Sequence, residues 1–189
     1  MSTYTPYSTT IPVLRNICNC AINILTTAKE ERAAQDTLPT EQELLDTAFA
    51  DMLPMRLQPI LFGKFAVAGI QKLGLHGSTP VPEMNPAAFS SFDDMITFFK
   101  QVAAIMDAVD EKAYNESANK DFDMEVASKT LHMSGLEDFA QSFAIPNAYF
   151  HLNAIYMLLR SKGFKLGKGK YIGAFFTEQA KNDWKPITG

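Results

Sequence analysis

The chain has 189 residues, of which 47% are hydrophobic and 20% are charged, and its formal net charge is -4. These values exclude a disordered, collagen-like or disulfide-stapled protein and are typical of a single globular domain. The unusual feature is the presence of 14 Phe and 9 Met beside one Trp. Such side chains either fill an ordinary core or line a pocket for an apolar ligand.

Charge and cysteine content limit the partners and the compartment. The 17 basic and 21 acidic residues form no basic stripe, so no nucleic-acid partner is expected. No apolar run reaches the roughly 18 to 20 residues of a membrane-spanning helix, and residues 1–10 carry no basic residue of a secretion signal. Cys18 and Cys20 would point about 200° apart on a helix and cannot readily bridge. We therefore expect reduced thiols in a cytoplasmic protein that does not bind membranes.

Two helices are predicted before residue 50. Apolar residues at the helical spacing predict a helix over about residues 10–33, with Thr10 as its N-cap and Pro12 in its first turn. A second, short helix over residues 40–48 is indicated by a capping box that Thr40 opens.

A longer apolar segment follows over residues 53–73 and ends where Gly74 can supply a left-handed cap. Because Pro59 lies inside this segment, the helix either kinks there or begins near Gln58. The stretch 76–86 contains three prolines and no periodicity, which predicts a loop.

The next helix is predicted to begin after Ser91, which forms a capping box with Asp94, and to end near Asp110. Between residues 114 and 133 the chain is polar and loses its helical period. A short β-hairpin is possible there, supported by the apolar residues Phe122, Met124, Val126 and Leu131.

The last long helix is predicted to begin at a capping pair of Ser134 with Glu137, to be interrupted by Pro146 and to stop at Gly163. The segment after residue 165 is expected to lie over the surface as coil or a short helical turn. Four long amphipathic segments with few strands predict an all-α four-helix bundle. It is expected to form one domain over residues 1–173, followed by a tail over residues 174–189.

The segment around Pro146 carries the strongest candidates for chemistry. Asn147 and His151 are four residues apart and therefore share one face of a helix. If that face is turned inward, His151 can act as a general acid or base, and Asn147 can orient it or a substrate. The alternative is a buried histidine satisfied by a hydrogen bond, with Asn147 pinning the interrupted backbone.

Gln58 is the next candidate, because it lies among apolar neighbours at the proline-disturbed start of a helix. It either faces the same interior or is an N-cap or surface residue. Asp51 is expected to cap the following helix. His76 and His132 fall in predicted loops and are expected to be solvated, and the three histidines follow no recognised metal-binding spacing. The glycine-lysine pairs of residues 166–170 do not match a phosphate-binding loop.

Several motifs resemble those of a known family. The most specific is Pro-Asn-x-Tyr-Phe-His, within Ala144-Ile145-Pro146-Asn147-Ala148-Tyr149-Phe150-His151. Others are Thr10-Ile11-Pro12, Asp51-Met52-Leu53-Pro54 and the segment from Leu166-Gly167-Lys168 to Tyr171-Ile172-Gly173. Over most of residues 8–173 the chain resembles the uncharacterised, DUF-type branch of the DinB/YfiT-like superfamily.

The resemblance implies an up-down-down-up four-helix bundle that is often dimeric. Members of the superfamily commonly bind a divalent metal through three histidines, one on the second long helix and two on the last, and some are thiol-dependent transferases. By position His151 resembles the second histidine of the last-helix pair, Asn147 replaces the first, and Gln58 lies near the helix-two ligand. Amides bind zinc or nickel poorly compared with imidazole, so no metal or other cofactor is expected.

Three functions remain open, and with them the question of whether the chain is an enzyme. The first is a small-molecule binder, or a metal-independent isomerase, cyclase or lyase, with Gln58, Asn147 and His151 in an apolar pocket between helices. The second is a non-catalytic dimeric scaffold, and the third is a residual divalent-metal protein of the DinB type. The expected partners are a small apolar ligand and a second copy of the chain. The side chains expected near such a pocket are Met55, Phe62, Tyr149 and Phe150.

Overall fold

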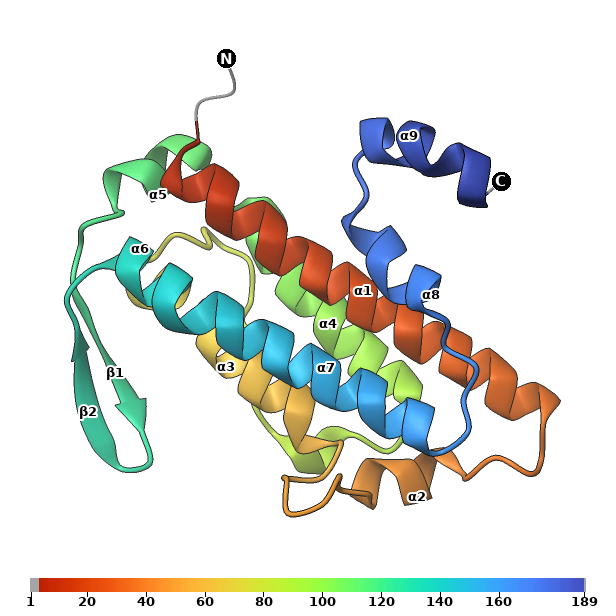
Figure 1. Cartoon of the computed structure of the whole chain (residues 1–189). Helices are drawn as coiled ribbons and strands as arrows, with labels where there is room; N and C mark the ends of the chain where they lie inside the picture. Colours follow the sequence, from red (N-terminus) through yellow and green to blue (C-terminus); the bar gives the residue numbers. More distant parts are fainter. Residues whose placement is uncertain (1–3, 189) are drawn as a thin grey trace.

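The computed structural model describes residues 4–188, so residues 1–3 of the predicted domain and residue 189 of the predicted tail lie outside it. Four long helices form the bundle (Figure 1). They are α1 (Pro6–Ala34), α3 (Leu57–Lys72), α4 (Phe92–Ala108) and a last helix composed of α6 (Leu136–Phe139), a π-helical turn (Ala140–Ala144) and α7 (Ile145–Ser161). The predicted four-helix bundle is confirmed.

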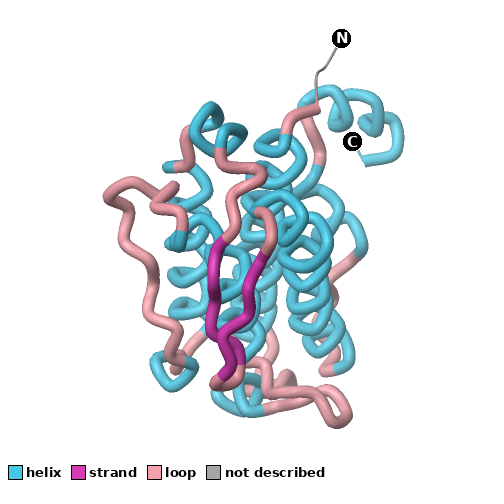
Figure 2. Tube along the Cα trace, turned by 90° about the vertical axis from the view of Figure 1, so that its left-hand side faces the viewer, coloured by secondary structure: helices cyan, strands magenta, loops and turns pink. Residues whose placement is uncertain are grey.

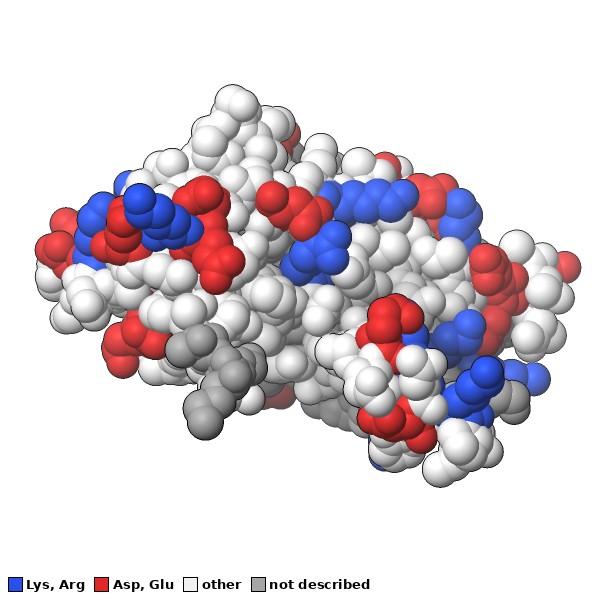
Figure 3. All heavy atoms as spheres, turned by 90° about the horizontal axis from the view of Figure 1, so that it is seen from above, with Lys and Arg blue, Asp and Glu red and all other residues white. Residues whose placement is uncertain are grey.

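Shorter elements connect and extend these helices. They are α2 (Glu41–Asp46), a 3-10 turn (Pro86–Ala88), α5 (Glu111–Glu116), β1 (Phe122–Val126), β2 (Lys129–Met133), α8 (Lys168–Ile172), a second 3-10 turn (Gly173–Phe175) and α9 (Glu178–Thr188). In the described part of the chain, no helix is both long and apolar enough to cross a membrane. Acidic and basic side chains are mixed over the face shown in Figure 3.

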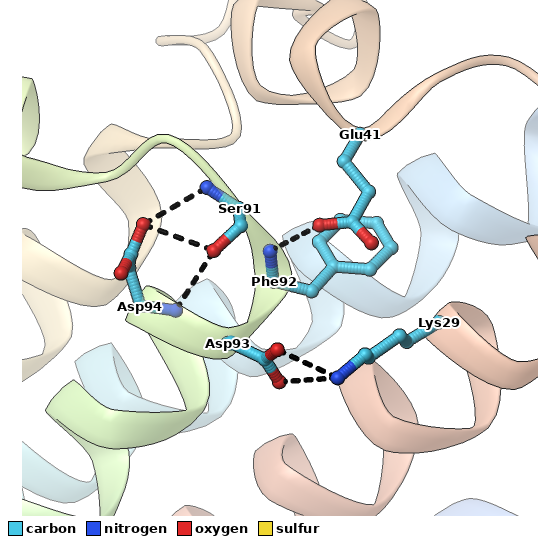
Figure 4. Close-up of polar contacts among 6 residues, drawn as sticks. All are labelled: Lys29, Glu41, Ser91, Phe92, Asp93 and Asp94. Carbon is cyan, nitrogen blue, oxygen red and sulfur yellow. Dashed lines mark hydrogen bonds and ion pairs between the residues drawn. The ribbon is translucent and has the colours of Figure 1, made fainter.

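α4 runs antiparallel to α1, and ion pairs near both ends of the two helices fix this direction. Near the end of α1, the Lys29 ammonium lies 2.6 and 2.7 Å from the two carboxylate oxygens of Asp93 at the start of α4 (Figure 4). Near the start of α1, Arg15 pairs with Asp107 at the end of α4.

The last helix runs parallel to α1. In the π-helical turn, the side-chain amide of Gln141 donates to the Thr10 hydroxyl near the start of α1, at 3.0 Å. Beyond α7, the backbone N–H of Lys165 donates to the Glu31 carboxylate near the end of α1, at 2.7 Å. α3 runs the opposite way, from beside α7 towards α6 (Figure 1). The order is therefore up-down-down-up, as the resemblance implies.

α1 begins earlier than the hydrophobic pattern predicts. Its N-cap is Thr5, which forms a reciprocal capping box with Ser8. The prediction of Thr10 as the N-cap is wrong, because Thr10 is buried within the helix. The apolar period begins with the first core-facing residues, and the polar turn before them belongs to the same helix.

Two of the predicted capping boxes are confirmed, at Thr40 and at Ser91 with Asp94. Figure 4 also shows the Glu41 carboxylate accepting the backbone N–H of Phe92 at 2.6 Å, so α2 caps α4 as well.

The capping pair predicted for Ser134 with Glu137 is wrong. Gly135 is the N-cap of α6, without a side-chain bond, and the backbone N–H of Glu137 donates to the carbonyl of Ala118 at 2.9 Å. The start of α6 is thus held by a segment distant in sequence, which a local motif cannot reveal.

The two prolines have different consequences. α3 begins at Leu57, so Pro59 lies in its first turn, where its missing N–H costs no helical hydrogen bond. Pro146 does not break the last helix, because the π-helical turn before α7 carries the chain past it.

The predicted hairpin is confirmed. β1 and β2 pair antiparallel, with Met124 opposite Leu131 and Asp123 opposite His132, and they cross one side of the bundle (Figure 2). The two turn residues between the strands have φ angles of 46° and 64°, which is the backbone of a type I′ turn. These residues are Ala and Ser rather than Asn and Gly, so the usual sequence signal is missing.

The C-terminal segment is more helical than predicted. α8 and the adjoining 3-10 turn lie on α1, where Asn23 donates to the carbonyl of Lys170 at 2.8 Å and the Cys20 thiol to that of Tyr171 at 3.3 Å. Burial raises the pKa of the Cys18 thiol, and that of Cys20 to about 12, so both thiols are protonated at neutral pH. α9 extends away from the bundle (Figure 1).

Candidate functional site

Gln58, in the first turn of α3, and His151, near the middle of α7, meet inside the bundle. Gln58 is 3% exposed and His151 is 6% exposed. Oε1 of Gln58 lies 2.8 Å from Nδ1 of His151. The amide nitrogen of Gln58 donates to the backbone carbonyl of Leu53 at 2.6 Å. Because that bond commits the nitrogen, the amide oxygen faces the imidazole. His151 therefore carries its proton on Nδ1.

The other ring nitrogen of His151 remains an acceptor. Within residues 4–188 no group bonds to Nε2, and the one fully buried side-chain nitrogen or oxygen without a partner there is Nε of Arg56. Nε2 therefore keeps contact with solvent although the residue is buried. Burial lowers the pKa of His151 to about 4, so the ring is uncharged at neutral pH and Nε2 offers a lone pair.

Asn147 lies one helical turn before His151, but its amide bonds elsewhere. Nδ2 of Asn147 donates to the backbone carbonyl of Leu61 in α3, at 3.3 Å. The structure thus brings Gln58 and His151 together and places Asn147 beside them as a separate link between α7 and α3. In this conformation Asn147 does not orient the imidazole.

A small apolar pocket of about 190 Å³ has Phe150, the chain neighbour of His151, in its wall. It lies between the loop that precedes α3 and the outer face of α7. The ring of Phe150, whose centroid is 5.2 Å from that of His151, forms part of its wall. The wall of this pocket contains none of Gln58, Asn147 and His151. The loop before α3 and helix α7 contribute to both the pair and the pocket, but through different residues. The wall is formed by Phe49, Met52, Phe150, Asn153, Ala154 and Met157.

Of the four side chains expected near a pocket, Phe150 lines this one and is 56% exposed. Met55 and Phe62 are fully buried in the core. Tyr149 is half-buried and packs its ring on Phe175, with centroids 5.9 Å apart.

Of the loop over residues 47–56, only Met55 was predicted to lie near the site, and Phe49 and Met52, which line the pocket, were not. An ion pair of 2.6 Å between Arg56 and Asp46 fastens this loop to α2, and the backbone N–H of Met55 donates to the carbonyl of Thr47 at 3.0 Å. The available signal was the unusual density of apolar residues in a non-helical stretch, namely Phe49, Met52 and Leu53.

The donors at the site do not fit a divalent metal. They comprise one imidazole and two amides, and the Gln58 amide already uses both its atoms, on His151 and Leu53. Across residues 4–188 no group of three or more His, Cys, Asp or Glu side chains is placed to hold a metal ion. The chemistry available here is therefore that of a neutral imidazole and two amides.

The remaining candidates lie outside this site. Nδ1 of His76 is 3.0 Å from a backbone carbonyl of its own loop, and Nδ1 of His132 is 2.9 Å from the Asp123 carboxylate on the outer face of the hairpin. The expectation that Asp51 caps α3 is wrong, because Arg56 is the N-cap and no side chain bonds there. The glycine-lysine pairs lead into α8.

Comparisons with known proteins identify relatives of this fold. The domain described as "Domain of unknown function (DUF1993)" matches residues 7–172. The crystal structure of a DinB family member protein from Shewanella denitrificans matches with a TM-score of 0.67 and 21% sequence identity, covering 88% of this chain and 91% of that chain. This similarity shows that the fold is DinB-like. No curated protein matches the chain.

Proposed function

The chain belongs to the DUF1993 family, and from this premise we propose that it binds a small, largely apolar molecule through Nε2 of His151, without a metal. The observation that carries the proposal is the state of this one atom. Every other polar side-chain atom of the Gln58–His151 pair has a protein partner. Nε2 of His151 has none within residues 4–188 and is in contact with solvent. A nearly buried acceptor of this kind suits a ligand that brings its own donor.

The hydrogen bonds around the pair support a recognition role because they prepare the acceptor in advance. Leu53 orients the amide of Gln58, and Gln58 in turn fixes the tautomer of His151. A ligand with an O–H or N–H group therefore meets a lone pair that needs no rearrangement of the ring.

The adjacent apolar pocket defines the ligand class. Its wall of Phe, Met and Ala side chains suits an apolar body, and its volume of about 190 Å³, below the roughly 300 Å³ at which ordinary small-molecule sites begin, limits that body to one small ring or branched aliphatic group. To reach Nε2, such a ligand would enter between Phe150 and the loop over residues 47–56.

Binding is better supported than acid-base catalysis. A pKa of about 4 makes His151 a weak base at neutral pH and leaves almost no protonated form to act as an acid. The same value is favourable for an uncharged acceptor.

Phenol and toluene test the proposal, because they share one shape and differ in the hydroxyl donor. With ¹⁵N-labelled histidine and ¹³C-methyl-labelled methionine, phenol should shift the resonances of Nε2 of His151 and of Met52 and Met157. Toluene should shift the methionine methyls alone. In a His151→Phe variant, phenol should lose its advantage over toluene, whereas His132→Gln should leave it unchanged. A phenol titration that leaves Nε2 unmoved, or that matches toluene, refutes the proposal.

A second candidate function, a dimeric scaffold, is favoured by the apolar exposure around the same pocket. Phe49, Leu53, Phe150 and Met157 are 48%, 52%, 56% and 53% exposed, and a second copy of the chain would cover them. Sedimentation equilibrium tests this. A dimer that Phe150→Glu dissociates and Leu131→Glu does not supports the scaffold, and a monomeric wild type excludes it.

A further inference from the structure

A larger pocket, of about 360 Å³, lies between the hairpin and the start of the last helix. Met124 and Leu131 form its wall on the side of the hairpin, and Phe65, Phe139 and Phe143 form its wall on the side of α3, α6 and the π-helical turn. It shares no lining residue with the pocket beside His151. Its volume falls within the range of small-molecule sites, about 300 to 1,000 Å³.

The π-helical turn shapes this pocket. Such turns add one residue to a helical turn and are frequent at functional sites. Here the ring of Phe143 packs edge-on against Phe65, with centroids 5.0 Å apart, and lies tilted against Phe139, with centroids 5.8 Å apart. Phe143 is nevertheless 43% exposed, and Leu131 in the hairpin is 40% exposed. The pocket thus has an aromatic wall that the chain leaves partly uncovered.

Asp138 supplies a free negative charge at the edge of this pocket. It is an exposed lining residue of α6, and no lysine, arginine or histidine within residues 4–188 forms an ion pair with it. His132, the other ionisable lining residue, already pairs with Asp123 at 2.9 Å and with Asp121 at 3.7 Å. The Lys64 ammonium lies 5.7 Å from the centroid of the Phe65 ring rather than at the carboxylate.

We propose that this pocket binds a small organic ammonium. Its apolar body would lie against Phe65, Phe139 and Phe143, and its charged end would lie at Asp138. The aromatic wall buries the apolar body, and the Asp138 carboxylate, which has no ion-pair partner within residues 4–188, offers the ammonium a charge-assisted hydrogen bond. The site is independent of the one proposed at His151.

Three compounds of matched shape test this inference, namely 4-phenylbutylammonium, 4-phenylbutanol and 4-phenylbutyrate. The methionine methyl spectrum distinguishes the two pockets. Met124 and Met133 line the pocket between the hairpin and the last helix, and Met52 and Met157 line the pocket next to Phe150. The ammonium compound should shift the methyls of Met124 and Met133 at the lowest concentration, the alcohol at a higher one and the carboxylate at the highest.

Charge variants isolate the role of Asp138. Asp138→Asn should weaken binding of the ammonium compound about threefold, the modest loss typical of an exposed ion pair, and should leave the alcohol unchanged. Glu137→Gln, which removes the neighbouring charge in the same helical turn, should change neither. The loss of affinity for the ammonium compound in Asp138→Asn should also be smaller at high salt, because exposed charges are screened.

Aromatic variants isolate the wall. Phe143→Ala should weaken all three compounds, whereas Phe150→Ala, in the other pocket, should not. Shifts confined to Met52 and Met157, absence of any shift, or equal binding of the alcohol and the ammonium compound would each overturn the assignment. Because Asp138 is exposed, its variant keeps the test decisive even if Phe143→Ala fails to fold.

Discussion

Oε1 of Gln58 accepts the Nδ1 proton of His151 across 2.8 Å inside the bundle. The amide nitrogen of the same glutamine donates to Leu53, so one side chain joins α7, α3 and the loop before α3. The pair fixes the tautomer of His151 and leaves Nε2 as the acceptor. This arrangement makes several consequences measurable.

Gln58→Glu should raise the pKa of His151. A carboxylate at this position would face Nδ1–H directly and favour the imidazolium by roughly 1 to 3 pH units. The histidine ¹⁵N resonances followed against pH measure the change. Gln71→Glu adds the same charge at an exposed position of α3 and should leave His151 unaffected. An unchanged pKa in Gln58→Glu would contradict the contact.

Acid should destabilise the fold through His151. The pKa of its ring is about 4 in the folded protein and 6.5 when unperturbed, so the unfolded chain binds the proton more readily. The stability that the neutral ring contributes is fully present above pH 6.5, declines as pH falls towards 4, and amounts to about 3 kcal/mol. Urea unfolding of wild type and His151→Gln between pH 4 and 7 isolates this component. As pH falls through that window, the free energy of unfolding should decrease more steeply for the wild type than for His151→Gln, whereas His132→Gln should follow the wild type.

Asn147→Ala should lower the free energy of unfolding by about 1 kcal/mol, because it removes the hydrogen bond to the Leu61 carbonyl. Asn153→Ala is the matched control on the exposed face of the same helix and should stay within about 0.5 kcal/mol of wild type. Equal losses for the two variants in urea unfolding would show that the link between α7 and α3 contributes nothing specific.

Gly63→Ala should destabilise the bundle by about 1 to 3 kcal/mol. A Cβ at Gly63 would lie 2.5 Å from Cζ of the buried Phe98 ring, so α3 and α4 would have to move apart. Gly169→Ala, in α8, meets nothing within 4 Å and should be neutral or slightly stabilising. In thermal unfolding, Gly63→Ala should therefore have a lower melting temperature than Gly169→Ala. The opposite order would refute the packing argument.

Local interactions made much of the fold predictable from the sequence. The helical period and the capping boxes at Thr40 and Ser91 act within a few residues of the chain, and they predict the long helices and the short helix α2. Predictions were wrong or poorly supported at the elements where the local signal in the sequence is weak or misleading. The start of α1 is a polar turn before the apolar period, the hairpin turn lacks Asn and Gly, and α6 is held by the distant Ala118.

The same distinction between local and long-range interactions applies to the candidate site. The sequence by itself determined that Asn147 and His151 share a face of one helix and that Pro59 either kinks α3 or places its start near Gln58, because helical geometry and proline chemistry are local. Only the tertiary structure decided that Gln58 and His151, 93 residues apart, form a pair, while Asn147 turns to Leu61. That pairing depends on the relative rotation of α3 and α7. The π-helical turn rotates α7 relative to α6 by about 100° for its one extra residue, and no spacing pattern along the chain records it.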